Sequence, residues 1–134
     1  MKKFYTSSLI VLLMVSFTSL AFSQDREPNN TFKEADKITG LVIDGNIEYP
    51  GDVDWFYLMR QEGKQTIKFF VTHTLPDDIT IEVYDGSVLV ARLADAKSSE
   101  SISCFVGTQK CWIKVWSRSN RSTGSYQITI IPEK

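Results

Sequence analysis

The sequence predicts an all-β protein, and the pattern of its side chains favours a sandwich or a barrel. From Leu41 onward apolar and polar residues alternate with a period of two, and turn residues recur at intervals of roughly 8–12 residues, as they do in short strands joined by tight turns. No long stretch shows a helical period, which excludes folds that alternate helices with parallel strands. We therefore expect about eight strands around one core.

The first 23 residues have the pattern of a secretory signal peptide. Met1-Lys2-Lys3 is basic, a mostly apolar run follows, and Ala21-Phe22-Ser23 places small residues at the positions required for cleavage before Gln24. The alternative is a membrane anchor, but the run is short for a span of about 20 residues and polar residues interrupt it. We expect an exported protein, periplasmic or secreted.

The remaining chain, residues 24–134, has the size of one domain, with 24–40 as an N-terminal segment that packs on the sandwich. The net charge is −1 and the basic residues are scattered, which argues against nucleic acid as a partner. No later apolar run is long enough to cross a membrane.

The expected strands are separated by short turn sequences, such as Tyr49-Pro50-Gly51-Asp52 before the second strand. A polar connection is expected at Ala94–Glu100. In chain order the strands are Leu41–Ile47, Val53–Arg60, Gln65–Thr72, Ile79–Val83, Val88–Leu93, Ser101–Val106, Lys110–Ser117 and Ser125–Ile131.

The sequence contains two cysteines, Cys104 and Cys111, and their spacing predicts a disulfide in an exported protein. If Gly107 and Thr108 form a two-residue turn, the flanking strands pair as a hairpin and place the cysteines opposite each other. The alternative is a pair of metal ligands, but two cysteines and the single His73 do not make a zinc site.

Four short motifs occur in a fixed order along the predicted domain. They are Glu27-Pro28-Asn29-Asn30, Gly51-Asp52-Val53-Asp54-Trp55-Phe56, Ile79-x-Ile81-x-Val83-Tyr84-Asp85 and Gly124-Ser125-Tyr126-Gln127-Ile128-Thr129-Ile130. Together they resemble the bacterial pre-peptidase C-terminal domain, to which the collagen-binding domains of clostridial collagenases are related. The resemblance covers nearly the whole predicted domain and implies a jelly-roll-like antiparallel β-sandwich.

The resemblance also implies a calcium site, because the collagen-binding relatives join an acidic N-terminal segment to a D-x-D turn around Ca²⁺. Transferred to this sequence, the expected ligands are Glu27, Asn29, Asn30, Asp52 and Asp54. These residues offer only the hard carboxylate and amide oxygens that Ca²⁺ prefers, and acids this close would repel one another without a cation. The alternative from the residues alone is that the acids form turns and cap a strand, and that the segment around Glu27 is a disordered tail.

A possible binding surface is predicted on the strand Trp112-Ile113-Lys114-Val115-Trp116. If Ile113 and Val115 point inward, then Trp112, Lys114 and Trp116 share the outward face, and Phe105 joins them across the predicted hairpin. Exposed tryptophans beside a lysine make a platform for a sugar ring or an extended peptide. The alternative is that a loop or the N-terminal segment covers this face.

An enzymatic role is not expected. The single histidine lies at a strand end between Thr72 and Thr74, and no sequence marks an activated nucleophile. The adjacent acids are typical of turns. We expect a secreted, non-catalytic, calcium-stabilised binding module for an extracellular polymer or protein, with collagen or polysaccharide as examples. The alternatives are an accessory subunit or partner of another exported protein, such as a protease, and, less favoured, a small secreted hydrolase.

Overall fold

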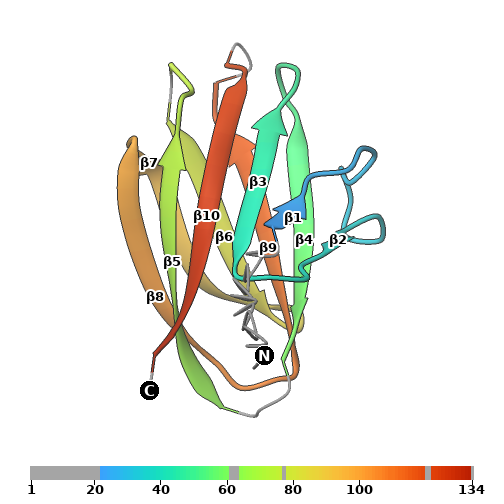
Figure 1. Ribbon diagram of the computed structural model, residues 1–134, viewed down its shortest axis with the longest axis vertical. Coiled ribbons are helices and arrows are strands. Elements are labelled where there is room, and N and C mark those ends of the chain that lie inside the picture. Colours follow the sequence, from blue (N-terminus) through green and yellow to red (C-terminus); the bar gives the residue numbers. More distant parts are fainter. Residues whose placement is uncertain (1–21, 61–63, 77, 120–121, 134) are drawn as a thin grey trace, which may run out of the picture.

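The computed structural model describes residues 22–60, 64–76, 78–119 and 122–133, and this part of the chain forms a sandwich of two five-stranded sheets (Figure 1). The strands are β1 (Phe22–Gln24), β2 (Asp36–Lys37), β3 (Val42–Ile47), β4 (Val53–Met59), β5 (Gln65–His73), β6 (Ile79–Asp85), β7 (Val88–Ala96), β8 (Ser99–Val106), β9 (Lys110–Ser117) and β10 (Gly124–Glu133). The predicted all-β sandwich is confirmed at this level.

Sheet A has the strand order β1-β3-β10-β5-β8, and sheet B has the order β2-β4-β9-β6-β7. The long strands pair antiparallel, but β1 pairs with β3 and β2 pairs with β4 in parallel. The prediction of about eight strands in a purely antiparallel sandwich is therefore wrong on both counts. The eight predicted strands are present, but β1 and β2 are three and two residues long, too short to show any alternation in the sequence.

The alternating sequence places one apolar face of each sheet in the space between them. On β5, for example, Ile67, Phe69 and Val71 are fully buried while their neighbours are partly exposed. The largest fully buried side chains include Phe56 on sheet B and Phe69 on sheet A. Burying each such side chain stabilises the fold by roughly 2–3 kcal/mol.

The connection expected at Ala94–Glu100 is instead mostly strand, because β7 continues to Ala96 and β8 begins at Ser99. The pairing of β7 with β6 shifts register in this region, and Asp95 adopts a positive φ of 54°. A bulge of this kind bends an edge strand without ending it. The polar residues that suggested a loop are thus part of an irregular edge.

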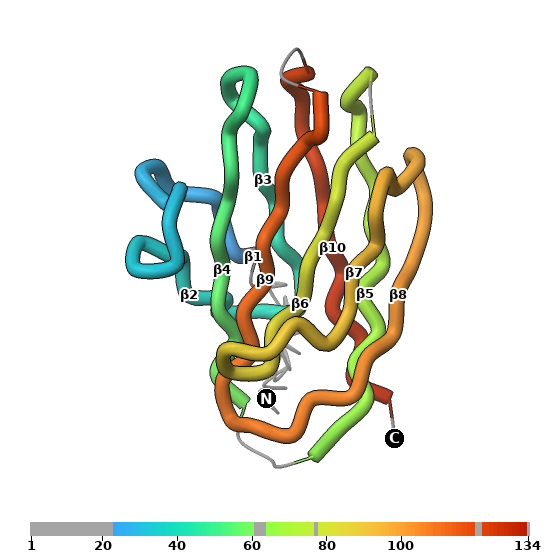
Figure 2. The backbone as a smooth tube through the Cα atoms, turned by 180° about the vertical axis from the view of Figure 1, so that it is seen from behind, coloured from blue at the N-terminus to red at the C-terminus, as the bar shows by residue number. Residues whose placement is uncertain are grey.

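The predicted hairpin between β8 and β9 does not exist. β8 pairs with β5 in sheet A, whereas β9 pairs with β4 and β6 in sheet B. Figure 2 shows the chain leaving β8 and running along one end of the sandwich to reach β9. Side-chain hydrogen bonds hold this crossing in place. The Arg60 guanidinium donates to the carbonyl of Thr108, and the Asp85 carboxylate accepts the N–H groups of Gly107 and Thr108.

The predicted disulfide is also wrong. Cys104 and Cys111 are both free and buried, Cys104 on sheet A and Cys111 on sheet B. The prediction came from an even pair of cysteines close in sequence, with the hairpin register as its geometric support, and the crossing between sheets removes that support. Burial raises the pKa of the Cys104 thiol to about 11 and that of the Cys111 thiol to about 12, so both are neutral core side chains.

The predicted signal peptide, residues 1–23, lies outside the described residues except for its last two positions. Phe22 and Ser23 belong to β1, and Ser23 is buried and accepts a hydrogen bond from the backbone N–H of Thr39 at 2.8 Å. The predicted cleavage point before Gln24 therefore falls within a strand. Among the described residues, no helix is long and apolar enough to cross a membrane.

Candidate functional site

The N-terminal segment lies against the start of β4, so the two oxygen-rich motifs meet. The backbone N–H of Trp55 donates to the carbonyl of Asn29 at 3.0 Å, and the short strand β2 continues this contact by pairing Asp36 with Phe56. Figure 1 shows the segment that contains β1 and β2 at the edge of the sandwich beside β3 and β4. Residues twenty or more positions apart in sequence thus become neighbours.

A tight turn places the first aspartate of the D-x-D motif. The N–H of Asp52 donates to the carbonyl of Tyr49 at 3.1 Å, and Gly51 between them has a φ of 88°, which a side chain disfavours. Pro50 has the fixed φ that suits the preceding position of such a turn. Asp52 is 1% exposed, and one of its carboxylate oxygens accepts the N–H of Glu48 at 2.7 Å.

The second aspartate, Asp54, points from β4 into the interior and is fully buried. The hydroxyl of Tyr126, on β10 of the opposite sheet, donates to one of its oxygens at 2.5 Å. This contact requires Gly45, because a Cβ atom there would lie only 2.2 Å from the Tyr126 ring. The tyrosine crosses the sandwich through the space that the missing side chain leaves.

Three carboxylates converge at this edge of the sandwich. Oxygens of Asp25, Glu27 and Asp54 all lie within 4.8 Å of one another. Asp25 follows β1, whose parallel pairing with β3 holds it there, and its carboxylate accepts hydrogen bonds from Asn29 at 2.5 Å and from the N–H of Asn46 at 3.1 Å. We call the set Asp25, Glu27, Asn29, Asp52 and Asp54 the acidic cluster.

Three buried oxygens of the acidic cluster have no hydrogen-bond partner. They are Oδ1 of Asn29, Oδ1 of Asp52 and Oδ1 of Asp54. A buried acceptor without a partner costs roughly 1–3 kcal/mol, and more when it is charged. Unpartnered hard oxygens beside converging carboxylates form the type of donor set that binds Ca²⁺.

Burial and mutual repulsion shift the titration of these acids. Burial raises the pKa of Asp54 to about 8, the Tyr126 hydroxyl lowers it, and the negative charges of Asp25, Asp52 and Glu27 raise it further. Burial also raises the pKa of Asp25 and of Glu27, and the charge of Asp52 adds to both effects. The cluster therefore resists holding several negative charges without a cation.

The structure changes the membership of the predicted ligand set. Asn30 is peripheral, because its amide nitrogen donates to Glu27 at 3.2 Å and its oxygen accepts the Tyr49 hydroxyl at 2.9 Å. Asp25, which sequence reasoning missed, lies within the cluster. Its position in a polar segment with no periodicity gave no signal, since only the pairing of β1 brings it to β4.

The second feature of interest is the outer face of sheet B. The sequence has three tryptophans, and Trp55 on β4 and Trp112 and Trp116 on β9 all point outward from this sheet. Tyr57 and Tyr84 join them, with ring centroids of Tyr57 and Trp112 at 5.4 Å and of Trp55 and Tyr84 at 5.6 Å. We call these five rings the aromatic face.

The N-terminal segment covers part of the aromatic face. The ring of Phe32 lies over Trp112 with a centroid distance of 3.7 Å and meets Trp55 edge-on at 5.8 Å. Trp112 is only 8% exposed as a result, whereas Trp55 and Trp116 remain partly exposed. Of the two expectations, an open platform and a covered one, the covered one describes Trp112.

Phe105 does not belong to this face, contrary to the prediction. It lies on β8 of sheet A, where it is 56% exposed, because the chain crosses between sheets after β8. Lys114 does belong to it, with its ammonium 5.6 Å from the Trp55 ring centre and 5.4 Å from that of Trp116. Lys110 lies similarly over Tyr57 and Trp112, at 4.4 and 4.1 Å.

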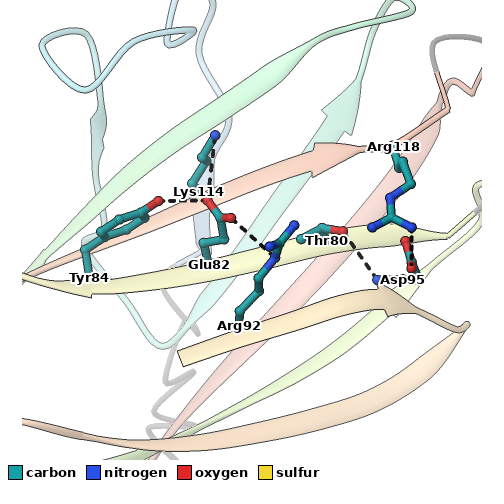
Figure 3. A network of polar contacts seen from close by, with 7 residues as sticks. All are labelled: Thr80, Glu82, Tyr84, Arg92, Asp95, Lys114 and Arg118. Atoms are coloured by element: carbon teal, nitrogen blue, oxygen red, sulfur yellow. Dashed lines mark hydrogen bonds and ion pairs between the residues drawn. The ribbon is translucent and has the colours of Figure 1, made fainter. Parts of the chain in front are cut away.

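The charges on the outer face of sheet B form two groups of polar contacts, one around Glu82 and one that joins Asp95 to Arg118, as Figure 3 shows. The buried Glu82 on β6 pairs with Lys114 at 3.6 Å and with Arg92 at 3.5 Å, and it accepts the Tyr84 hydroxyl at 2.8 Å. Burial and the hydrogen bond to Glu82 raise the pKa of Tyr84 to about 12. The Glu82 carboxylate and the Tyr84 hydroxyl thus have partners, whereas the buried Nε1 of the neighbouring Trp116 has none among the described residues.

His73, the single histidine, lies at the end of β5 and is half-buried. Its Nε2 lies 2.8 Å from the carbonyl oxygen of Ala96, so this nitrogen donates a hydrogen bond. The ring occurs beside a shallow polar depression of about 460 Å³ that Asp25, Asp44 and Thr72 also line. The contact with Ala96 ties β5 to the end of β7 across the sandwich.

The fold and these two features define an all-β sandwich module with an acidic cluster at one edge. No family model matches the sequence, and no curated protein matches it. Among solved structures, the pre-peptidase C-terminal domain of collagenase from Bacillus anthracis matches with a TM-score of 0.61 at 14% identity, over 72% of this chain and 94% of that chain. The resemblance expected from the four motifs is thus confirmed at the level of the fold.

A second solved structure has a similar architecture. PliG from Aeromonas hydrophila, a periplasmic lysozyme inhibitor of g-type lysozyme, matches with a TM-score of 0.51 at 12% identity, over 83% of this chain and all of that chain, 100%. At such low identities both matches establish the fold of this chain.

Proposed function

We propose that this protein is an exported, non-catalytic, calcium-stabilised binding module for an extracellular polymer or protein. The observation that carries the proposal is the position of the tryptophans, since all three lie on the outer face of one sheet. A stable core needs large apolar side chains inside, and here Phe56 and Phe69 fill that role. Rigid aromatic surface on the outside is the usual means of binding a ligand at low entropic cost.

The proposed calcium ion fits the acidic cluster. The side chains that would hold it are Asp25, Glu27, Asn29, Asp52 and Asp54, whose oxygens either converge or lack a hydrogen-bond partner. When bound, the ion supplies the positive charge that the cluster lacks. These residues would hold the ion between β4 and the N-terminal segment, so binding would tie that segment, and Phe32 with it, to the sandwich.

Thermal unfolding in calcium and in EGTA tests the metal part of the proposal. With calcium at about 100 times its dissociation constant, the ion stabilises the fold by about 2.7 kcal/mol, which corresponds to roughly 10 °C for a domain of this size. In EGTA we expect the melting temperature to fall by this amount and proteolysis of the segment before β4 to become faster. An unchanged melting temperature would rule the calcium site out.

A binding comparison of three alanine variants tests the proposed surface. Trp116→Ala and Trp55→Ala remove partly exposed rings from the aromatic face, and Phe105→Ala removes an exposed ring from sheet A as the matched control. Co-sedimentation with collagen, peptidoglycan and insoluble polysaccharides should show a ligand whose binding the tryptophan variants weaken at least tenfold. Equal binding by all three variants would contradict a role for this face.

The alternative is an accessory protein that binds another exported protein. The likeness to a periplasmic lysozyme inhibitor favours this alternative, although it concerns the fold only. Capture from culture supernatant by immobilised protein, with the Trp116→Ala variant beside it, separates the two proposals. Recovery of one exported protein that depends on Trp116, without binding to any polymer, would establish the alternative.

A further inference from the structure

The outer face of sheet B carries an excess of positive charge on a protein whose net charge is −1. The ion pairs and cation–ring contacts of this face involve two acids and four bases, and each acid is already paired with at least one of those bases. The acids are Glu82 and Asp95, and the bases are Arg92, Lys110, Lys114 and Arg118. An anionic ligand therefore complements this surface.

Glu82 holds two of these bases in place instead of neutralising them. It is 7% exposed and lies beside Lys114 at 3.6 Å and Arg92 at 3.5 Å, so one carboxylate is shared between two cations (Figure 3). A positive charge remains after this sharing. Because the two cations are fixed before a ligand arrives, a second carboxylate can pair with them at little entropic cost.

The ring of Trp116 lies near the same two cations. Its centre is 5.4 Å from the Lys114 ammonium and 5.9 Å from the Arg92 guanidinium. The ring is partly exposed, and Trp55 continues the aromatic surface on the other side of Lys114, at 5.6 Å. A ligand for this place must combine a flat apolar surface with an acidic group a few ångströms away.

The strands that carry Trp116, Lys114 and Glu82 are internal to sheet B, whereas Arg92 lies on its edge strand, β7. β9 is paired on both sides, with β4 and with β6, so its backbone groups are not available to an added strand. An extended peptide usually gains its affinity from such backbone pairing at a sheet edge. A pyranose ring needs no backbone partner, because its C–H face stacks on tryptophan and its substituents bind side chains.

We propose that this surface binds an acidic polysaccharide, with a uronate ring on Trp116 and its carboxylate between Lys114 and Arg92. The inference rests on the proposed function, because it names the polymer for the same aromatic face. Glu82 is a positioning residue that keeps both cations beside the ring.

The test measures binding of the intact protein to polygalacturonate by isothermal titration calorimetry at low and high salt. We expect saturable binding that weakens as salt rises. Lys114→Gln and Arg92→Gln should each weaken it about tenfold, since each removes one charge-assisted contact. Lys68→Gln removes the same charge from the partly exposed outer face of sheet A and should change nothing.

Two further ligands separate the uronate from other anions. Methyl-esterified polygalacturonate keeps the sugar rings and lacks the charge, so it should bind at least tenfold more weakly. Polyglutamate keeps the charge and lacks the rings; if it binds as tightly as polygalacturonate, and Trp116→Ala weakens neither, the inference is wrong. Trp116→Phe keeps a ring and should retain most of the affinity, while circular dichroism confirms that the variants fold.

Failure of this inference can be told apart from failure of the proposed function. If polygalacturonate does not bind, but collagen, peptidoglycan or an exported protein binds in a Trp116-dependent way, the module stands and the acidic polysaccharide is wrong. If no ligand depends on Trp116 or Trp55, both proposals fail.

Discussion

Buried carboxylates have oppositely charged neighbours in the network around Glu82 and like-charged neighbours in the acidic cluster. Glu82 shares its charge with Lys114 and Arg92 and accepts a tyrosine hydroxyl. Asp54 also accepts a tyrosine hydroxyl, from Tyr126, but the charged groups that act on it belong to other acids. Both sites join strands that are distant in sequence, and one of them lacks its counter-charge.

The difference indicates what each region needs in order to be stable. A buried charge is tolerated when opposite charges and hydrogen bonds compensate for lost hydration, and it is costly otherwise. The network on sheet B is complete with protein side chains alone. The acidic cluster leaves three buried oxygens unpartnered, which is the physical basis for proposing a cation there.

The largest expected effect comes from removing the central charge of the acidic cluster. Asp54→Asn should abolish the calcium-dependent gain of roughly 10 °C and raise the melting temperature of the calcium-free protein, because it removes a carboxyl group whose ionisation is disfavoured by burial and by the neighbouring acids. Asp44→Asn is the control: Asp44 lies nearby on β3 but already accepts a hydrogen bond from Gln127 at 2.8 Å. An equal response of both variants to calcium would contradict the assignment.

The pH dependence of the calcium-free protein should reveal the cost of burying the Asp54 carboxyl group among other acids. The pKa of Asp54 is about 8 in the folded state against an ordinary value of 3.8, so between these values unfolding releases a proton. The free energy of unfolding should therefore decrease as pH rises from about 4 to about 8. Urea titrations in calcium-depleted buffer measure this slope, and Asp54→Asn should flatten it. A rising slope in that window would overturn the interpretation.

A smaller effect is expected from breaking the completed network. Glu82→Gln keeps the acceptor for Tyr84 but removes the charge between Lys114 and Arg92, which then repel each other across a partly exposed surface. We expect a loss of about 1 kcal/mol, independent of calcium. Glu100→Gln, near the start of the edge strand β8 of sheet A, serves as the control in the same chemical denaturation. A calcium-dependent loss in Glu82→Gln would show that the two regions are coupled.

A similarly small effect on stability is expected for Phe32, which links the two regions. Phe32→Ala should cost about 1 kcal/mol and shift the tryptophan emission to longer wavelength, because Trp112 loses its cover. Phe105→Ala removes a ring of similar exposure that contacts no other ring among the described residues, and it should leave the emission unchanged. An unshifted spectrum in Phe32→Ala would mean that the segment does not cover the face in solution.

Sequence reasoning succeeded where the determining pattern was local. The alternation along β5 or β9 reports which side chains face the core, so the strands and the outward direction of Trp112, Lys114 and Trp116 were predictable. It failed at β8 and β9, where two strands joined by a short connection look like a hairpin in sequence. Pairing partners depend on which sheet each strand joins, and no pattern within the strands encodes that choice.

By itself, the sequence determined an all-β sandwich, its eight long strands and the turn that holds Asp52, because period and turn chemistry act over a few residues. The tertiary structure alone decided that β1 would bring Asp25 beside Asp54, that Tyr126 would cross the core above Gly45, and that Cys104 and Cys111 would lie in opposite sheets. Each of these contacts joins distant segments, and their geometry follows from how whole strands pack against one another.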